Sequence, residues 1–577
     1  MSARRGVFIF LLLVAVLGAL VLFAALALRG PSTVVHPSTV LIFDVPSELE
    51  ESDLPYGSYR FGFLRPERPT LWSVIDGIRA AAEDERIEGL VLHIDDIDWG
   101  WAKVAEVRDA VLSFRAAGKP VYASLSGGGE REYLLATTAQ TLSTEPLAVL
   151  QLDGLTASAL FFRGTFDKLE VTPNFASVGQ YKSGVEGYTR TGMSPAAREA
   201  LEALLASQYR ILVDTLGSAR GLPPDSIQRL LDAGPFGAEE ALASGLVDTV
   251  LYPADLDSVA TGGRGLRRPT LSMSRYLARP RGSAQAPRIA LVVAEGTIAA
   301  GKSREEPGAG RILGIETLVT ALRDARARKS VKAVVLRIDS PGGAAQGADE
   351  IWREVKRCRA AKPLIVSMSD LAASGGYYIA APADTILAQP GTITGSIGVF
   401  GGKLNILGLY RKLGLNVETV SRGRHAGMLS PFRDFTPEEQ ELFQSQMDAV
   451  YRTFLSRVAE GRALKAQDVD SIGQGRVWSG VDAQERHLVD GLGGLERALE
   501  AARAKAGLAP DQEFVVDVYP KIERTILQRL LAELVGEGED DALAVLKLQP
   551  TLRAWIAAAR FPSGVCLALM PYAIDIR

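Results

Sequence analysis

Two glycine-rich turns in the second half of the chain have residue types that suit acyl transfer. Ser-Pro-Gly-Gly occupies residues 340–343, after an apolar, strand-like run, and Ala-Ala-Ser-Gly-Gly-Tyr-Tyr occupies residues 372–378, after the next such run. Glycines let backbone N–H groups approach a ligand closely, and the first N–H groups of a helix lack intrahelical partners. Converging N–H groups stabilise an oxyanion, and the Ser374 hydroxyl could face the same cleft. In the alternative interpretation, Ser374 is a helix N-cap and Gly343 a turn residue.

A nucleophilic serine needs a base, and the sequence restricts the choice. The chain has 4 histidines. Three lie outside any strand-end position comparable to that of Ser374 (His36, His93 and His487), whereas His425 stays a candidate. A lysine can serve when burial lowers its pKa. Lys182, in Gln-Tyr-Lys-Ser-Gly-Val-Glu after the strand-like run 172–178, stands out, although a lysine considered alone is usually a solvated surface residue.

The predicted elements around the glycine turns alternate between strands and helices. Residues 331–338 are continuously apolar and rich in β-branched side chains, which predicts a buried strand. Residues 345–360 place Ile351, Val355 and Cys358 on one helical face, and residues 363–368 predict the next strand. Strand, helix and strand in this order indicate parallel βαβ units, so we expect an α/β fold.

The chain also contains one domain twice. Residues 91–95 (VLHID) resemble 335–339 (VLRID), residues 118–122 (GKPVY) resemble 361–365 (AKPLI), and Gly-Leu-Val-Asp at 245–248 resembles His-Leu-Val-Asp at 487–490. The three segments occur in the same order in both halves of the chain, and nearly the same number of residues separates the two members of each pair. Such a long period indicates a duplicated domain rather than a solenoid. Residues 39–45 and 289–295 are predicted to open the two copies as strands.

The N-terminus predicts a membrane anchor. Residues 7–28 contain no charged or strongly polar side chain, and a helix of this length, about 33 Å, spans a hydrocarbon core about 30 Å thick. Arg4 and Arg5 precede it, so the positive-inside rule places the body outside the cytoplasm. A cleaved signal peptide is the alternative. The short apolar run 564–574 is interpreted as a buried or interfacial tail.

Composition excludes several classes. Lys+Arg 64 against Asp+Glu 68 gives a net charge of −4, so we expect no nucleic-acid partner. Two cysteines support neither a disulfide framework nor a four-thiolate zinc site, and we expect no metal and no cofactor. Residues 261–287 are rich in Gly, Arg, Ser and Pro. We interpret them as a solvated linker, with contact to anionic lipid as the alternative.

Four motifs, their order and the duplication together resemble the long, duplicated signal peptide peptidases of the S49 serine-peptidase family. The motifs are Tyr-Lys-Ser at 181–183, Ser-Pro-Gly-Gly at 340–343, Ala-Ala-Ser-Gly-Gly-Tyr at 372–377 and Thr-Gly-Ser-Ile-Gly at 394–398. The resemblance ends near Ala502. Together with the apolar run, the repeat and the composition, it predicts a membrane anchor at 1–30 (transmembrane 7–28), a first S49-like domain at 38–260, a linker at 261–287, a second S49-like domain at 288–523, and a tail of unknown role at 524–577.

The resemblance also implies a ClpP/crotonase-like fold and a Ser–Lys dyad. Ser374 matches the nucleophile, Lys182 the general base and Ser396 the serine that hydrogen-bonds the lysine. Gly375 N–H and Gly343 N–H match the oxyanion hole. The expected enzyme is a homo-tetrameric serine endopeptidase. It is anchored in bacterial cytoplasmic-membrane lipid and degrades apolar, cleaved signal peptides on the extracytoplasmic side.

The duplication is consistent with a site divided between the copies. The first-copy position opposite Ser374 is Glu130 or Arg131, and the second-copy counterpart of the Lys182 segment, residues 420–425, has arginines but no lysine. Arginine cannot act as a base near neutral pH. We expect both halves of the dyad to come from one chain. Two rival interpretations remain, a crotonase-like acyl-transfer enzyme and a non-catalytic membrane scaffold.

Overall fold

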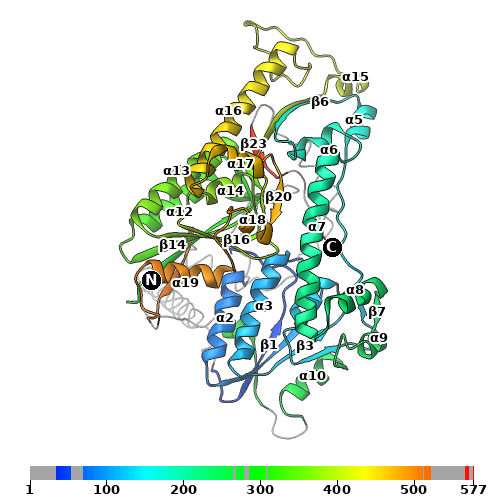
Figure 1. Cartoon of the computed structure of the whole chain (residues 1–577), viewed down its shortest axis with the longest axis vertical. Helices are drawn as coiled ribbons and strands as arrows, with labels where there is room; N and C mark the ends of the chain where they lie inside the picture. Colours follow the sequence, from blue (N-terminus) through cyan, green and yellow to red (C-terminus); the bar gives the residue numbers. More distant parts are fainter. Residues whose placement is uncertain are drawn as a thin grey trace, which may run out of the picture.

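The computed structural model describes residues 34–52, 69–263, 268–277, 285–306, 310–510, 512–521, 566–570 and 576. The predicted transmembrane run 7–28 and most of the C-terminal tail lie outside these residues. Within the described part of the chain, no helix combines the length and the apolar character that a membrane crossing needs. The described residues form three large β-sheets with helices packed around them (Figure 1).

The first sheet belongs to the first copy, in the lower part of Figure 1, and all its strands are parallel. Its strand order is β8-β4-β3-β2-β1-β9: Thr249–Val250, Thr141–Thr144, Val121–Leu125, Ile87–Ile94, Thr39–Asp44 and Thr270–Ser272. The helices α2 (Leu71–Glu83), α3 (Trp101–Ala116) and α4 (Glu130–Ala136) connect its strands.

The predicted linker 261–287 is partly wrong. Within it, β9 joins the first sheet beside β1, and α11 (Met273–Leu277) follows directly. Met273 and Tyr276 are buried in the first core, and Leu271 packs against it. These apolar side chains explain why the segment folds onto the sheet instead of remaining solvated.

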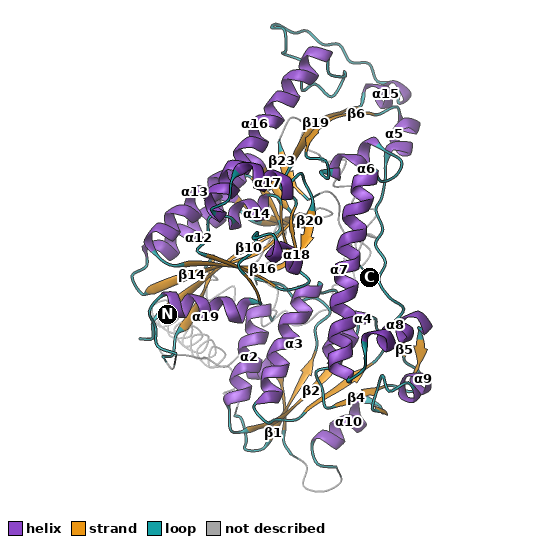
Figure 2. Ribbon diagram, in the orientation of Figure 1, coloured by secondary structure: helices purple, strands orange, loops and turns teal. Residues whose placement is uncertain are grey.

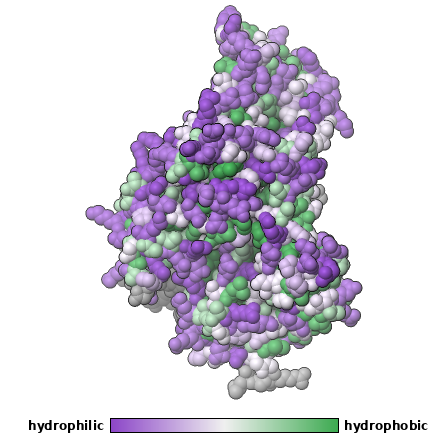
Figure 3. Space-filling model, viewed as in Figure 1, coloured by the Kyte–Doolittle hydropathy of each residue, from purple (hydrophilic) through white to green (hydrophobic). Residues whose placement is uncertain are grey.

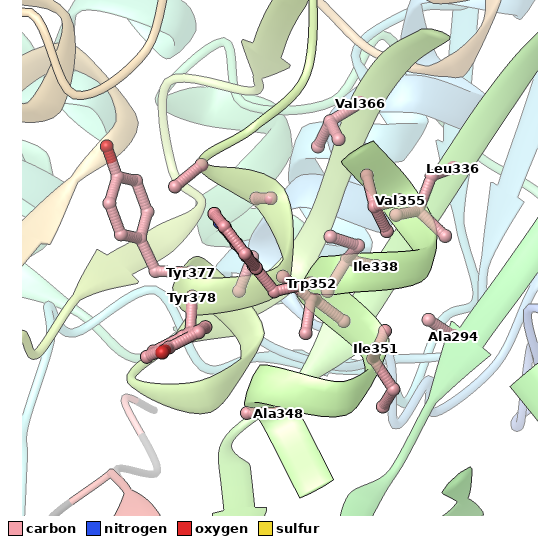
Figure 4. Packing of buried hydrophobic residues seen from close by; sticks show 14 of the residues in the cluster. Ala294, Leu336, Ile338, Ala348, Ile351, Trp352, Val355, Val366, Tyr377 and Tyr378 are labelled. Atoms are coloured by element: carbon pink, nitrogen blue, oxygen red, sulfur yellow. The ribbon is translucent and has the colours of Figure 1, made fainter. Parts of the chain in front are cut away.

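The second sheet repeats the plan, and its βαβ order confirms the predicted α/β class and duplication. Its strand order is β20-β18-β16-β14-β10-β22, with β17 beside β16 and β21 beside β17: Val477–Ser479, Ile393–Gly395, Leu364–Ala373, Val331–Ser340, Arg288–Glu295, Val515–Tyr519, Thr385–Ala388 and Gly491–Leu492. The helices α12 (Ile315–Ala327) and α13 (Ala345–Ala361) cover one face, and α19 (Leu495–Lys505) covers the other. Figure 4 shows Ile351 and Val355 of α13 beside Leu336 and Ile338 of β14.

The third sheet joins the two copies. Its strand order is β12-β13-β11-β15-β23-β19-β6: Arg304–Glu306, Gly310–Gly314, Thr297–Ala299, Gly342–Ala344, Leu567–Leu569, Val399–Asn405 and Thr172–Val178. The strand β6 comes from the first copy, yet it pairs antiparallel with β19 of the second, from Val399↔Val178 to Asn405↔Thr172. Because of this pairing, the segment that follows β6, which contains Lys182, lies against the second copy.

A long helix also connects the two copies. The helix α7 (Pro195–Arg220) runs from α8 (Pro224–Ala233) in the first copy to β20 in the second (Figure 2). In Figure 3, hydrophilic residues cover most of the visible face, and hydrophobic residues gather near its middle, where the upper and lower parts meet.

A buried ionic cluster also crosses the junction. The Arg337 guanidinium, on β14, donates to both Glu51 carboxylate oxygens (3.0 and 2.9 Å) and lies 2.7 Å from a Glu106 oxygen. Lys103 lies 2.9 Å from Asp339. Burial raises the pKa of Glu106 to about 7, although the neighbouring Arg337 guanidinium favours the charged form.

Removing the shared cation should therefore be costly. Arg337→Ala leaves two buried carboxylates without their guanidinium, so the free energy of unfolding should fall by about 3–5 kcal/mol. Chemical denaturation of the variant and the native chain measures the difference. Arg323→Ala, at a half-exposed pair with Glu354, is the matched control and should cost less than about 1 kcal/mol. Equal losses in the two variants would contradict the importance of the cluster.

Candidate active site

Ser374 lies at the sharp junction between β16 and the short helix α14 (Gly375–Ala380). Its backbone has φ 56° and ψ −112°, in a region that non-glycine residues rarely occupy. Its N–H donates to the carbonyl of Gly395 (2.8 Å), which holds the turn against the end of β18. The side chain makes no capping hydrogen bond to the helix. Ser374 thus occupies the N-cap position of α14 without capping it through its side chain, and its hydroxyl is directed elsewhere.

Lys182 reaches this serine from the first copy. It follows β6, and the pairing of β6 with β19 carries it across the junction. Lys182 Nζ lies 2.9 Å from Ser374 Oγ, 2.9 Å from Ser396 Oγ and 2.9 Å from the Ser396 carbonyl oxygen. Three residues that the sequence singled out thus meet at one nitrogen, within a single chain.

The surroundings favour a neutral amine. Lys182 is 2% exposed, and Ser374 and Ser396 are fully buried. Burial holds the pKa of Lys182 well below its usual value, and only the nearby Cys566 opposes the shift. A neutral amine has two N–H donors and one lone pair. The Ser396 carbonyl can accept one hydrogen and Ser396 Oγ the other, which leaves the lone pair for the Ser374 hydroxyl proton.

The two glycine turns touch each other beside Ser374. A Cβ atom on Gly375 would lie 3.2 Å from the Gly343 nitrogen and 3.1 Å from the Gly342 Cα atom. Gly342 has φ 96°, and a Cβ there would lie 2.5 Å from the Gly375 nitrogen. Side chains are therefore excluded where the two turns meet. The geometry brings the backbone nitrogens of Gly343 and Gly375 together, as an oxyanion-binding pair requires.

A loop that none of the sequence motifs includes packs against Lys182. Gly475 has φ 80°, and a Cβ atom at this position would lie 2.5 Å from the backbone nitrogen of Lys182. The Tyr181 N–H donates to Gln474, and the Ser396 N–H donates to Arg476, both at 2.7 Å. The run Gly-Gln-Gly at 473–475 was a visible turn signal. Nothing local connected it with a lysine almost 300 residues earlier.

The other candidate base lies in a different environment. The His425 ring nitrogens lie 3.8 Å from Glu438 and 3.7 Å from Glu439, in the first turn of α16 (Pro437–Arg462). The Ser374 hydroxyl contacts Lys182 instead. In the first copy, Glu130 opens α4 at the place that matches Ser374, and its carboxylate accepts the N–H groups of Asp153 (3.1 Å) and Gly154 (2.8 Å).

Ser396 should orient the amine without reacting itself. Its backbone φ of 52° holds both of its oxygens toward Lys182 Nζ. Ser396→Ala removes one of the two acceptors, so the lysine loses alignment and kcat for peptide hydrolysis should fall about 10- to 100-fold, with KM little changed. Ser177→Ala, on β6 but outside these contacts, is the control and should keep the native rate. A normal kcat for Ser396→Ala would show that the carbonyl alone suffices.

The fold and the site together define a class. An α/β unit occurs twice, and a serine hydroxyl, a buried lysine and two adjacent glycine nitrogens meet where the units join. This set of groups suits acyl transfer through a serine. The sequence profile of peptidase family S49 matches residues 113–266 and 356–509, one match in each copy.

Individual relatives agree with this match. The chloroplastic serine protease SPPA of Arabidopsis thaliana is 36% identical over 441 residues, which are 74% of this chain and 64% of the relative. Protease 4 of Salmonella typhi is 32% identical over 509 residues, 84% of this chain and 81% of the relative. A putative signal peptide peptidase SppA of Enterococcus faecium is 36% identical over 194 residues, 33% of this chain and 56% of the relative. The chain belongs to peptidase family S49, and the resemblance found in its motifs is confirmed.

Proposed function

We propose that this chain is a serine endopeptidase with a Ser374–Lys182 dyad in a duplicated, ClpP/crotonase-like architecture. The contact between Lys182 Nζ and Ser374 Oγ, 2.9 Å long and fully buried, carries the proposal. Burial lowers the pKa of the Lys182 amine, so the neutral amine can accept a proton from the adjacent Ser374 hydroxyl.

In the proposed reaction, Lys182 transfers the protons and Ser374 forms the bond to the substrate. Neutral Lys182 takes the Ser374 proton as the serine oxygen attacks a peptide carbonyl carbon. The N–H groups of Gly343 and Gly375 stabilise the oxyanion, and Ser396 keeps the amine aligned. The lysine ammonium then protonates the leaving amine. A water molecule, deprotonated by Lys182, finally releases the acyl group from Ser374.

The substrates that we propose are apolar, cleaved signal peptides at the outer side of the bacterial cytoplasmic membrane. Three observations support this choice: the uncharged run 7–28 as an anchor, the arginines before it, and a relative described as a signal peptide peptidase. A homo-tetramer, implied by the family resemblance, belongs to the same proposal. The crotonase-like alternative called for a carboxylate or nucleotide pocket in place of Lys182, and the lysine contacts favour the peptidase.

Covalent labelling tests the nucleophile separately from substrate choice. The full chain is treated with a fluorophosphonate and analysed by intact mass and peptide mapping. We expect one adduct, on Ser374, with more labelling as the pH rises and Lys182 becomes neutral. Ser374→Ala should remain unlabelled, whereas Ser258→Ala, on an exposed helix of the first copy, should label like the native chain. An adduct on another serine would contradict the proposed site.

A further inference from the structure

The strand that leads to Ser374 is irregular just before the serine. The parallel pairing of β16 with β14 is regular as far as Met368 and resumes at Ala372. Between these residues β16 contains the segment Ser369–Leu371, where β14 has only Asp339. We call Ser369–Leu371 the bulge. A bulge bends its strand and redirects the residues that follow, which here form the nucleophile turn.

The first copy lacks this irregularity at the matching place. Its strands β2 and β3 pair without a shift of register up to Ile94↔Leu125. This pair corresponds, in the repeat, to the last regular pair before the bulge. The first copy also has Glu130 where the second copy has Ser374. The bulge therefore accompanies the nucleophile and not the fold that both copies share.

The first copy holds the bulge through the N-terminus of α3. One Asp370 carboxylate oxygen accepts the N–H groups of Ala102 (2.8 Å) and Lys103 (3.0 Å). The other oxygen accepts the N–H group of Gly100 (3.2 Å), the N-cap residue, which makes no side-chain cap of its own. A carboxylate of the second copy thus caps a helix of the first, which the helix dipole also favours. In Figure 2, the upper end of α3 lies just below β16.

The Lys103 side chain ties the neighbouring strand to the same place. Its Nζ lies 2.9 Å from one Asp339 oxygen, and the other Asp339 oxygen accepts the Leu371 N–H group (3.2 Å) across the bulge. Lys103 Nζ also lies 3.8 Å from Asp370. Although burial disfavours its charge, the carboxylates of Asp339 and Glu51 hold the pKa of Lys103 above its usual value, so the amine stays charged. Both strands that lead into the glycine turns are therefore bound to the start of α3.

We propose that Asp370 is a positioning residue through which the first copy sets the place of Ser374 relative to Lys182, an inference that rests on the proposed function. The Asp370 carboxylate binds α3, so it acts on the serine through the backbone that joins them. Only the segment Leu371–Ala373 lies between, and this segment pairs with β18 on its other side. A displacement of the bulge therefore reaches the nucleophile turn, and a misplacement of about 1 Å at reacting atoms can cost about 100-fold in rate.

The first copy then makes two separate contributions to the site. It supplies Lys182 through β6, and it holds the turn that bears Ser374 through α3. Both contacts require the two copies to be docked. The base and the correctly placed nucleophile are therefore assembled in the same step.

Steady-state kinetics of the full chain with an apolar reporter peptide test the positioning role. Asp370→Ala removes the acceptor of three N–H groups, so kcat should fall about 10- to 100-fold while KM changes less than about threefold. Asp370→Asn keeps an oxygen for the Ala102 and Lys103 N–H groups and should recover most of the rate. Asp109→Ala is the matched control. It removes another contact between α3 and the second copy, to Gln389 (3.2 Å), and should keep the native kcat.

A second variant displaces the carboxylate from the first copy. A Cβ atom on Gly100 would lie 2.2 Å from Asp370 Cγ, although the Gly100 backbone, with φ −76°, suits alanine. Gly100→Ala should therefore lower kcat, and the rate at which a fluorophosphonate labels Ser374, at least about tenfold. Gly164→Ala is its control and should keep the native values, because a Cβ atom there, in α5 (Arg163–Leu169), would meet nothing within 4 Å.

The outcomes separate this inference from the proposed function, with circular dichroism and thermal unfolding as the check on each fold. A native kcat in folded Asp370→Ala or Gly100→Ala would overturn the inference and leave the peptidase assignment in place. So would an equal loss of kcat in Asp109→Ala. Unfolding of both Asp370→Ala and Gly100→Ala would also overturn it, because the contact would then stabilise the fold and not place the serine. A native chain that neither hydrolyses the reporter nor takes the label on Ser374 would contradict both.

Discussion

Ser374→Ala is expected to reduce peptide hydrolysis by about 10⁴-fold or more, because the variant lacks the only atom proposed to form a bond with the substrate. The change removes one buried oxygen whose contact is the Lys182 amine, so the fold should persist. Rates with an apolar fluorogenic peptide measure the loss, and circular dichroism with thermal unfolding checks the fold.

The control for this variant is another serine-to-alanine change. The Ser258 hydroxyl donates to the Ala254 carbonyl in its own helix, in the first copy. Ser258→Ala should therefore retain the native rate. Residual hydrolysis by Ser374→Ala well above the uncatalysed level would assign the nucleophile to another residue.

Lys182→Arg should be as inactive as Lys182→Ala, with both losing about 10²- to 10⁴-fold in kcat/KM. A guanidinium stays protonated at any working pH, so it can hold a charge at this place but cannot take the Ser374 proton. Lys119→Arg is the matched control. Burial lowers the pKa of Lys119 as well, but its amine donates to the Ala81 and Asp84 carbonyls, in the first copy. A near-native rate for Lys182→Arg would show that the side chain at this position contributes only a positive charge to binding and is not the base.

The pH profile adds an independent measurement. Burial disfavours the charged amine, so the pKa of Lys182 lies below its usual value. The ammonium form is inactive because it has no lone pair. Activity should therefore rise with pH through that lowered pKa and reach a plateau above it, well before an exposed lysine would titrate. An acid limb that is unchanged in Lys182→Ala would belong to another group.

Local patterns in the sequence determined the repeating units of this protein. The apolar run 331–338 became β14, and the helical face of Ile351 and Val355 became the buried side of α13. Both depend on periodicity within one segment, which neighbouring side chains alone establish. The glycines after residues 364–373 also predicted a turn at Ser374, but they left open an N-cap role for this serine, and only the structure shows its strained backbone. The resemblance to S49 peptidases then implied the roles of Ser374, Lys182 and Ser396 in the site.

Tertiary structure alone decided how the site is assembled. No pattern in residues 172–178 states that this strand pairs with residues 399–405, because a strand edge offers the same N–H and C=O groups to any partner. The choice depends on packing across the whole junction, and it alone brings Lys182 to Ser374. The same holds for β9, β15 and β23. Each has three residues, too few for a periodic signal, and its place depends on contacts made after the two copies have met.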